Sequence, residues 1–229
     1  MQKEDMKLWL SKVSLFNDLS ASKLVPIVEI SQTRMFKQNM YVFMEEDPQE
    51  KLFFIHSGKI KIYKTDPSGR EQILYILEPG DMFPYEGFFT QGNYHTHAEV
   101  IEDVMLIVIP IDKFREILSY QPELCVKLVS IMEEKIMDLQ NRLEEQILHN
   151  TYEQIILLLI RLCKSNGIKM GELYQLTTHF TNRELANMIG TTRETVSRTI
   201  NHLKKKEFIL PGKESSLLIN RIALKQELY

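Results

Sequence analysis

The order of apolar and polar positions changes character along the chain. After a short N-terminal stretch of helical periodicity containing Trp9, Val13, Phe16 and Leu19, aromatic and β-branched residues become frequent. Apolar runs there are separated by Asp-Pro, Ser-Gly, Pro-Ser-Gly and Pro-Gly sequences, which are typical of turns. The pattern predicts short strands at 40–44, 52–56, 59–63, 72–77 and 104–109. Strands of this length and spacing predict a small antiparallel barrel or roll.

A long helix is predicted after this region, because neither glycine nor proline occurs between Pro122 and Gly167. Apolar residues three and four apart, with charged residues between them, form one stripe along it. Such a stripe either packs on the protein's own roll or forms the seam of a coiled-coil-like dimer. We favour the dimer, because the spacing continues for several turns. The predicted dimer-interface residues are Leu128, Met132, Ile136, Leu139 and Leu143.

The stripe is interrupted at 149–151, where Asn150 or Thr151 can cap another helix. That helix carries the run IILLLIRL and is apolar on nearly all sides. A helix of this kind is expected to be buried inside a second domain.

A helix-turn-helix pattern begins at Phe180. Thr181 and Glu184 have the spacing of a capping box, and Gly190 ends the short helix that they start. After a very short turn, Thr192 can cap a second helix. Each helix has one apolar face, formed by Leu185, Ala186, Ile189, Val196, Ile200 and Leu203.

The second of these helices presents polar groups on its N-terminal outer face. Arg193 and Ser197 are four residues apart, as are Glu194 and Arg198, so successive turns carry them together. Arginine can donate two hydrogen bonds to guanine, and glutamate can accept one from cytosine. The alternative is a solvated helix face with internal ion pairs, but the caps, the tight turn and the basic end favour DNA recognition. The predicted DNA-binding residues are Thr181, Asn182, Thr192, Arg193, Glu194, Ser197, Arg198, Lys204 and Lys205.

Residues 208–220 predict two short strands around a Pro-Gly turn, which would form the wing of a winged helix-turn-helix. We therefore predict an α+β protein with an N-terminal antiparallel β-roll, a long dimerisation helix and a C-terminal winged helix-turn-helix domain. The predicted bounds are 1–115 for the effector-sensing roll, 116–149 for the dimerisation helix and 150–229 for the DNA-binding domain.

Charge is distributed unevenly along the chain. The net charge is −3, but residues 151–229 hold 12 lysines and arginines against 7 acids, whereas residues 1–150 hold 16 against 24. A basic C-terminal part suits a polyanionic partner such as DNA. No apolar run reaches the roughly 20 residues that cross a bilayer, and the N-terminus lacks a signal-peptide pattern, so we expect a cytoplasmic protein without a membrane partner.

Catalytic and metal-binding patterns are absent from the sequence. It contains no nucleophile elbow, P-loop, metal-ligand cluster or kinase signature, so no catalytic residues and no metal are predicted. Cys125 and Cys163 are the only cysteines and are interpreted as buried thiols, with a redox role as the alternative. His95 and His97 lack a third ligand and make a weak metal or haem site.

The motif RETVSR at 193–198 resembles the recognition helix of the Crp/Fnr family of bacterial regulators, and the resemblance covers nearly the whole chain. Ser57-Gly58, Pro79-Gly80-Asp81 and Gly87-Phe88-Phe89 resemble that family's effector-binding roll. The resemblance implies a homodimer that binds near-palindromic DNA and contacts RNA polymerase. The alternative is a cyclic-nucleotide-binding regulatory subunit or module that acts on a protein partner.

The motif combines features of two branches of that family. Arg193 resembles the cyclic-AMP branch and Ser197 resembles the oxygen-sensing branch. We expect half-sites close to TGTGA, with TTGAN as the alternative. The four-cysteine cluster of the oxygen sensors is absent, which argues against an iron-sulfur cluster.

The effector pocket departs from the family pattern. Alignment on Gly87 and Phe88 places Tyr85 and Glu86 where the family has its ribose-binding run, and His95 and Thr96 where an arginine and a hydroxyl bind phosphate. Histidine does not replace a permanently charged, bidentate guanidinium, so tight cyclic-AMP binding is not expected. These four residues remain a hypothetical pocket for another small-molecule effector, and activity without any ligand is the alternative.

Overall fold

The computed structural model describes residues 1–87, 89–90, 92–212 and 216–228. The chain forms two compact units, one from Met1–Lys64 and Leu74–Met137, the other from Thr65–Ile73 and Asp138–Tyr229. Among the described residues, no helix has both the length and the apolar character needed to span a bilayer.

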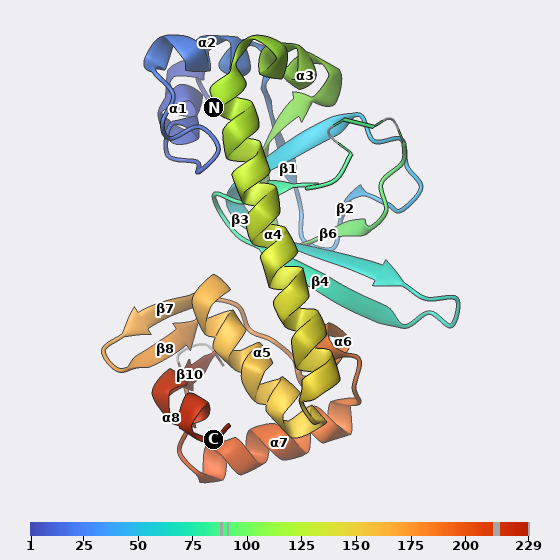
Figure 1. Ribbon diagram of the computed structural model, residues 1–229, viewed down its shortest axis with the longest axis vertical. Helices are drawn as coiled ribbons and strands as arrows, with labels where there is room; N and C mark the ends of the chain where they lie inside the picture. Colours follow the sequence, from blue (N-terminus) through green and yellow to red (C-terminus); the bar gives the residue numbers. More distant parts are fainter. Residues whose placement is uncertain (88, 91, 213–215, 229) are drawn as a thin grey trace. The chain divides into compact units, whose positions relative to one another are not determined.

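The first unit contains a six-stranded sheet (Figure 1). Its main path runs β1-β6-β3-β4, while β2 pairs with β6 and β5 pairs with β3. The strands are β1 (Gln32–Phe36), β2 (Tyr41–Phe43), β3 (Lys51–Thr65), β4 (Glu71–Leu77), β5 (Met82–Phe83) and β6 (His97–Pro110). The pairings of β6 with β1, β2 and β3 are antiparallel, which confirms the antiparallel roll. β1 was not predicted by the sequence pattern.

The predicted turn at Ser57-Gly58 is wrong, because β3 continues through it as one strand. The register between β3 and β6 shifts around Ser57, which marks a bulge. Gly58 has a φ of 83°, and a Cβ atom there would lie 2.2 Å from the carbonyl oxygen of Asp103 on β6. Glycine is therefore required for close approach of two strands rather than for a turn.

The helices of the first unit are α1 (Lys3–Leu10), α2 (Ala21–Ile30), α3 (Ile111–Tyr120) and the first turns of α4 (Pro122–Leu148). They share a core with the sheet, in which the ring of Phe16 lies 5.1 Å from that of Phe54 and 6.4 Å from that of Phe114. The predicted N-terminal helical stretch is too long, since α1 ends at Leu10 while Val13 and Phe16 are buried from a non-helical segment. Burial of these side chains outweighs helical periodicity there.

The second unit contains the C-terminal end of α4 followed by α5, a small sheet and three further helices. The helices are α5 (Thr151–Ser165), α6 (Asn182–Ile189), α7 (Arg193–Lys205) and α8 (Arg221–Gln226). The sheet has the order β7-β8-β10-β9, with β7 (Gly167–Met170), β8 (Leu173–Leu176), β9 (Ile209–Pro211) and β10 (Leu217–Ile219). Five aliphatic side chains of α5 lie in the interior, which confirms a buried helix: Ile155, Ile156, Leu158, Leu159 and Leu162.

The predicted wing is present as the antiparallel pair β9 and β10, in which Leu218 is paired with Leu210. The tip of the turn, residues 213–215, lies outside the described residues. The hairpin of β7 and β8 extends the same sheet and was not predicted. Of the predicted domain bounds, position 116 falls inside α3, and position 150 falls between α4 and α5.

Candidate nucleic-acid interface

The first helix of the helix-turn-helix begins and ends as its sequence predicts. The Thr181 hydroxyl accepts a hydrogen bond from the backbone N–H of Glu184 (3.2 Å), and the Glu184 carboxylate accepts from the backbone N–H of Thr181 (2.8 Å). Gly190 ends α6 in the left-handed conformation with φ 73°. The capping box and the glycine therefore position the turn that precedes α7.

The recognition helix α7 is capped by Thr192, whose hydroxyl accepts from the backbone N–H of Thr195 (3.2 Å). One face of α7 is buried in the second unit, through Val196, Thr199, Ile200 and Leu203. This packing leaves the opposite face of the helix for a partner.

The polar residues predicted from sequence lie on that opposite face. Arg193, Glu194 and Arg198 are exposed, and Ser197 is half-buried. Within the described part of the chain, the two arginines and Glu194 form no ion pair within 4.0 Å, so the alternative of a face closed by internal ion pairs is not supported. These three charged side chains are exposed on the side of α7 that a partner could approach.

The carboxyl group of Glu194 is held in its charged form. Its pKa is lowered mainly by a hydrogen bond from its own backbone N–H, then by the Thr192 hydroxyl, and also by the charges of Arg193 and Arg198. An ionised carboxylate only accepts hydrogen bonds, which suits a partner amino group such as N4 of cytosine.

The remaining predicted DNA-binding residues frame this face. Thr181 is exposed and Asn182 is half-buried at the start of α6, while Lys204 and Lys205 are exposed at the end of α7. Lys206 differs from these lysines, because its ammonium group donates to Oε1 of Glu227 at 2.6 Å. Sequence reasoning did not find this pair, which joins residues 21 positions apart.

The predicted effector residues lie in different surroundings. Glu86 and His95 are exposed, Tyr85 is half-buried and Thr96 is buried. The loop that carries Glu86 is held through its backbone, since the Gln49 side chain donates to the Glu86 carbonyl oxygen at 2.6 Å. Phe88, which belongs to the resemblance in this loop, lies outside the described residues.

Two cations near the loop were missed by sequence reasoning. Arg115 on α3 donates to the carbonyl oxygens of Gly87 (3.1 Å) and Thr90 (2.7 Å). Lys135 on α4 lies over the ring of Tyr85, 4.4 Å from its centre, and 5.3 Å from the centre of the Tyr75 ring. Both come from helices distant in sequence, so no local pattern could place them.

The two histidines near this loop do not act together. His95 is exposed, whereas Nδ1 of His97 accepts from the backbone N–H of Glu45 at 3.2 Å. Among the described residues, no group of three histidine, cysteine or acidic side chains could hold a metal ion.

The predicted dimer stripe on α4 needs one correction. Leu128 is 1% exposed and belongs to the core of the first unit, so its side chain is not available at a seam. Met132 is half-buried against the same core. The rest of the stripe is at least half exposed, at Ile136, Leu139, Leu143 and, one turn further, Ile147. The stripe therefore contains buried core positions and exposed positions at the same spacing, which periodicity alone does not separate.

Comparison with known proteins agrees with this geometry. Residues 33–121 match the family described as the cyclic nucleotide-binding domain, and residues 153–227 match the Crp-like helix-turn-helix domain. The CRP-like cAMP-activated global transcriptional regulator of Mycobacterium tuberculosis is 28% identical over 212 residues, covering 92% of this chain and 94% of that protein. The anaerobic regulatory protein of Bacillus subtilis is 28% identical over 207 residues, covering 90% and 87%.

Solved structures share the fold. FixK2 from Bradyrhizobium japonicum has a TM-score of 0.75 at 18% identity, covering 86% of this chain and 96% of that chain. A mutant of CooA from Carboxydothermus hydrogenoformans has a TM-score of 0.74 at 20% identity, covering 93% and 92%. With a cyclic nucleotide-binding domain, a Crp-like helix-turn-helix and relatives that match along nearly its full length, the chain belongs to the Crp/Fnr family of transcriptional regulators.

Proposed function

We propose that this protein is a cytoplasmic regulator that binds near-palindromic promoter DNA as a homodimer, with α7 in the major groove. The observation that carries the proposal is the exposed N-terminal face of α7, where Arg193, Glu194 and Arg198 are free of ion pairs within the described residues. Two guanidinium groups and one carboxylate, one turn apart, can distinguish guanine and cytosine in neighbouring base pairs. The expected half-site is close to TGTGA.

Affinity for the phosphate backbone is assigned to other residues. Lys204 and Lys205 are exposed at the C-terminal end of α7, and Thr181 and Asn182 lie at the start of α6. Such contacts fix the position of a protein on DNA without reading the bases.

The dimer is assigned to the exposed part of the α4 stripe. Ile136, Leu139 and Leu143 expose 56%, 50% and 61% of their surface, although all three are large and apolar. Two copies of α4 packed along this stripe would remove it from water and place two copies of α7 on one DNA duplex. We assign no catalytic activity, and contact with RNA polymerase is carried over from the family.

The regulatory input is assigned to the roll, without a named ligand. The Mycobacterium tuberculosis relative is described as cAMP-activated. In this chain the positions expected to bind the cyclic phosphate carry His95, which is exposed, and Thr96, which is buried. We propose that a different small molecule, or none, sets the activity.

A binding series on duplexes tests the proposal at fixed salt. One duplex carries two inverted TGTGA half-sites whose centres lie about one helical turn apart, and another carries the same bases scrambled. Arg198→Ala and Glu194→Ala should each reduce the preference for the TGTGA duplex by about 1–3 kcal/mol. Lys205→Ala should instead weaken both duplexes nearly equally. An Arg198→Ala protein that keeps the parent's preference would show that α7 does not read the site.

A further inference from the structure

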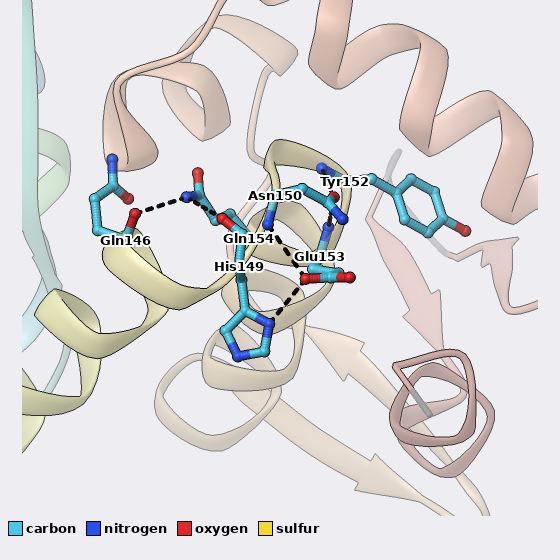
Figure 2. A network of polar contacts seen from close by, with 6 residues as sticks. All are labelled: Gln146, His149, Asn150, Tyr152, Glu153 and Gln154. Carbon is cyan, nitrogen blue, oxygen red and sulfur yellow. Dashed lines mark hydrogen bonds and ion pairs between the residues drawn. The ribbon is translucent and has the colours of Figure 1, made fainter.

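Side chains from both the joint and the start of α5 form hydrogen bonds across the connection between α4 and α5. Asn150 caps α5 by accepting hydrogen bonds from the backbone N–H groups of Tyr152 (3.0 Å) and Glu153 (3.1 Å). Glu153 returns to the backbone N–H of Asn150 (3.2 Å) and also bonds Nδ1 of His149 (2.9 Å), as Figure 2 shows. Only residues 149 and 150 separate the two helices, so the joint is short and internally bonded.

The last turn of α4 is bonded to α5 as well. The amide of Gln154 donates to the carbonyl oxygens of His149 (2.9 Å) and Gln146 (3.4 Å), which lie past the last hydrogen bonds within α4 (Figure 2). Arg161 on α5 pairs with Glu145 on α4. These contacts hold α5 on α4, but none of them reaches the helix-turn-helix.

Gln146 makes that connection. Its Nε2 donates to the carbonyl oxygen of Ile189 at 3.2 Å, in a partly buried contact between residues 43 positions apart. Ile189 is the last residue of α6, and only residues 190–192 separate it from Arg193 at the start of α7. Gln146 therefore bonds the end of α4 directly to the turn that positions the base-reading end of α7.

From this bond we infer that Gln146 is a positioning residue that sets the spacing of the two half-sites. The inference rests on the proposed homodimer, in which Leu139 and Leu143 would lie at the seam of two α4 helices. In that dimer the separation of the two α7 helices depends on how firmly each helix-turn-helix is attached to its own α4. The joint at 149–150, together with the bonds of Gln154 and Arg161, attaches α5 to α4, whereas the bond from Gln146 to Ile189 attaches the helix-turn-helix itself to α4.

Half-site spacing is the quantity that such an attachment controls. Changing the spacer by one base pair moves a half-site along the duplex and rotates it by about one tenth of a turn. If the two recognition helices are rigidly attached, they cannot adjust to the moved half-site, and affinity falls. If they are loosely attached, they can move with the half-site, and affinity changes little. A purely structural role for Gln146 would lower stability, or weaken all duplexes equally, without changing the order of preference among spacers.

The experiment compares three TGTGA duplexes, with the preferred spacer and with one base pair removed or added, at fixed salt. Gln146→Ala removes the side chain, and Gln146→Met keeps its length but cannot donate a hydrogen bond. Asn141→Ala is the matched control, because Asn141 is an exposed amide on the same helix with no hydrogen bond among the described residues. Circular dichroism and light scattering on every protein check folding and dimer state.

The spacer preference is the ratio of the affinity for the duplex with the preferred spacer to the affinity for a duplex with a changed spacer. In both Gln146 variants this ratio should be about fivefold lower than in the parent, because one neutral hydrogen bond contributes about a factor of five. They should keep the preference for TGTGA over scrambled half-sites, and Asn141→Ala should behave as the parent. A parent-like spacer preference in folded, dimeric Gln146→Met overturns the inference alone. A parent protein that is monomeric, or that ignores the half-sites, overturns the proposed function and the inference with it.

Discussion

The hydroxyl of Tyr152, at the start of α5, donates a hydrogen bond of 2.8 Å to Oε1 of Glu227, which directly follows α8. The same oxygen accepts from Lys206 at the end of α7. The pKa of Glu227 is lowered, chiefly by the bond from Lys206 and then by the bond from Tyr152. One carboxylate, which follows α8, thus joins the start of α5 to the C-terminal end of α7.

Tyr152→Phe should lower the free energy of unfolding by about 1.5–3 kcal/mol, because it removes one hydrogen bond to a charged carboxylate. The pKa of Tyr152 is raised to about 12, mainly by burial and further by Glu227. The folded chain therefore holds this proton more tightly than the unfolded chain, and the contribution of Tyr152 is lost as pH rises from about 10 to about 12. Urea unfolding at neutral and alkaline pH measures both effects.

The control is Tyr120→Phe, since Tyr120 is 59% exposed and has no hydroxyl partner among the described residues. A Tyr152→Phe protein as stable as this control at neutral pH would contradict a contribution from the Glu227 bond.

Glu153→Gln should lower the melting temperature at neutral pH, because the carboxylate bonds both His149 and the N-cap of α5. The pKa of Glu153 is lowered from its usual 4.5, first by the bond from His149. A carboxyl group with a lowered pKa stabilises the fold above 4.5, and this contribution disappears as pH falls below that value. The melting temperatures of parent and variant should therefore converge in acid. Glu144→Gln, on the exposed face of α4, is the control, and a constant difference at every pH would refute the assignment.

Leu139→Lys should convert the proposed dimer to a monomer, because it places a charge in the middle of the exposed stripe of α4. Leu128→Ala tests the buried end of the same stripe. It removes a side chain that is 1% exposed and should cost about 2–5 kcal/mol of stability without separating the subunits. Light scattering and urea unfolding distinguish the two outcomes, and a dimeric Leu139→Lys protein would place the interface elsewhere.

Cys163 should resist alkylation in the folded protein. Its thiol is 1% exposed, and burial raises its pKa to about 11, so little thiolate is present near neutral pH. Mass spectrometry after iodoacetamide treatment should find Cys163 modified only when urea is added. Modification in the native state would return Cys163 to consideration as a redox sensor.

Calorimetric titration with cyclic AMP should give no binding in the micromolar range or tighter. Alignment on Gly87 predicts that exposed His95 and buried Thr96 occupy the positions where the family binds the cyclic phosphate, and an imidazole ring cannot form the bidentate bonds of arginine. The cyclic-AMP-activated branch of the family would be expected to show the opposite result, so the experiment also separates this chain from that branch.

Features that depend on a few neighbouring residues were predictable from the sequence. The capping box of Thr181 and Glu184, the stop at Gly190 and the Thr192 cap are hydrogen bonds or backbone conformations that close within a few residues. Helical periodicity predicts the apolar face of α7, and the remaining positions of the helix form its polar face. The capped helices and the two faces of α7 were therefore predictable before any tertiary contact was known, whereas the assignment of the polar face to DNA stays a prediction.

The tertiary structure decided what periodicity and local spacing leave open. Leu128 and Leu139 share one apolar pattern, and only packing shows that the first is core and the second is exposed. The sequence around Gly58 predicts a turn, and only the structure shows that the residue lies within a strand, against the carbonyl oxygen of Asp103. The sequence alone determined the caps and the apolar faces of α6 and α7, because their signals are local. Contacts between distant segments, such as Gln146 with Ile189, could be decided only by the folded chain, because their energy depends on three-dimensional proximity.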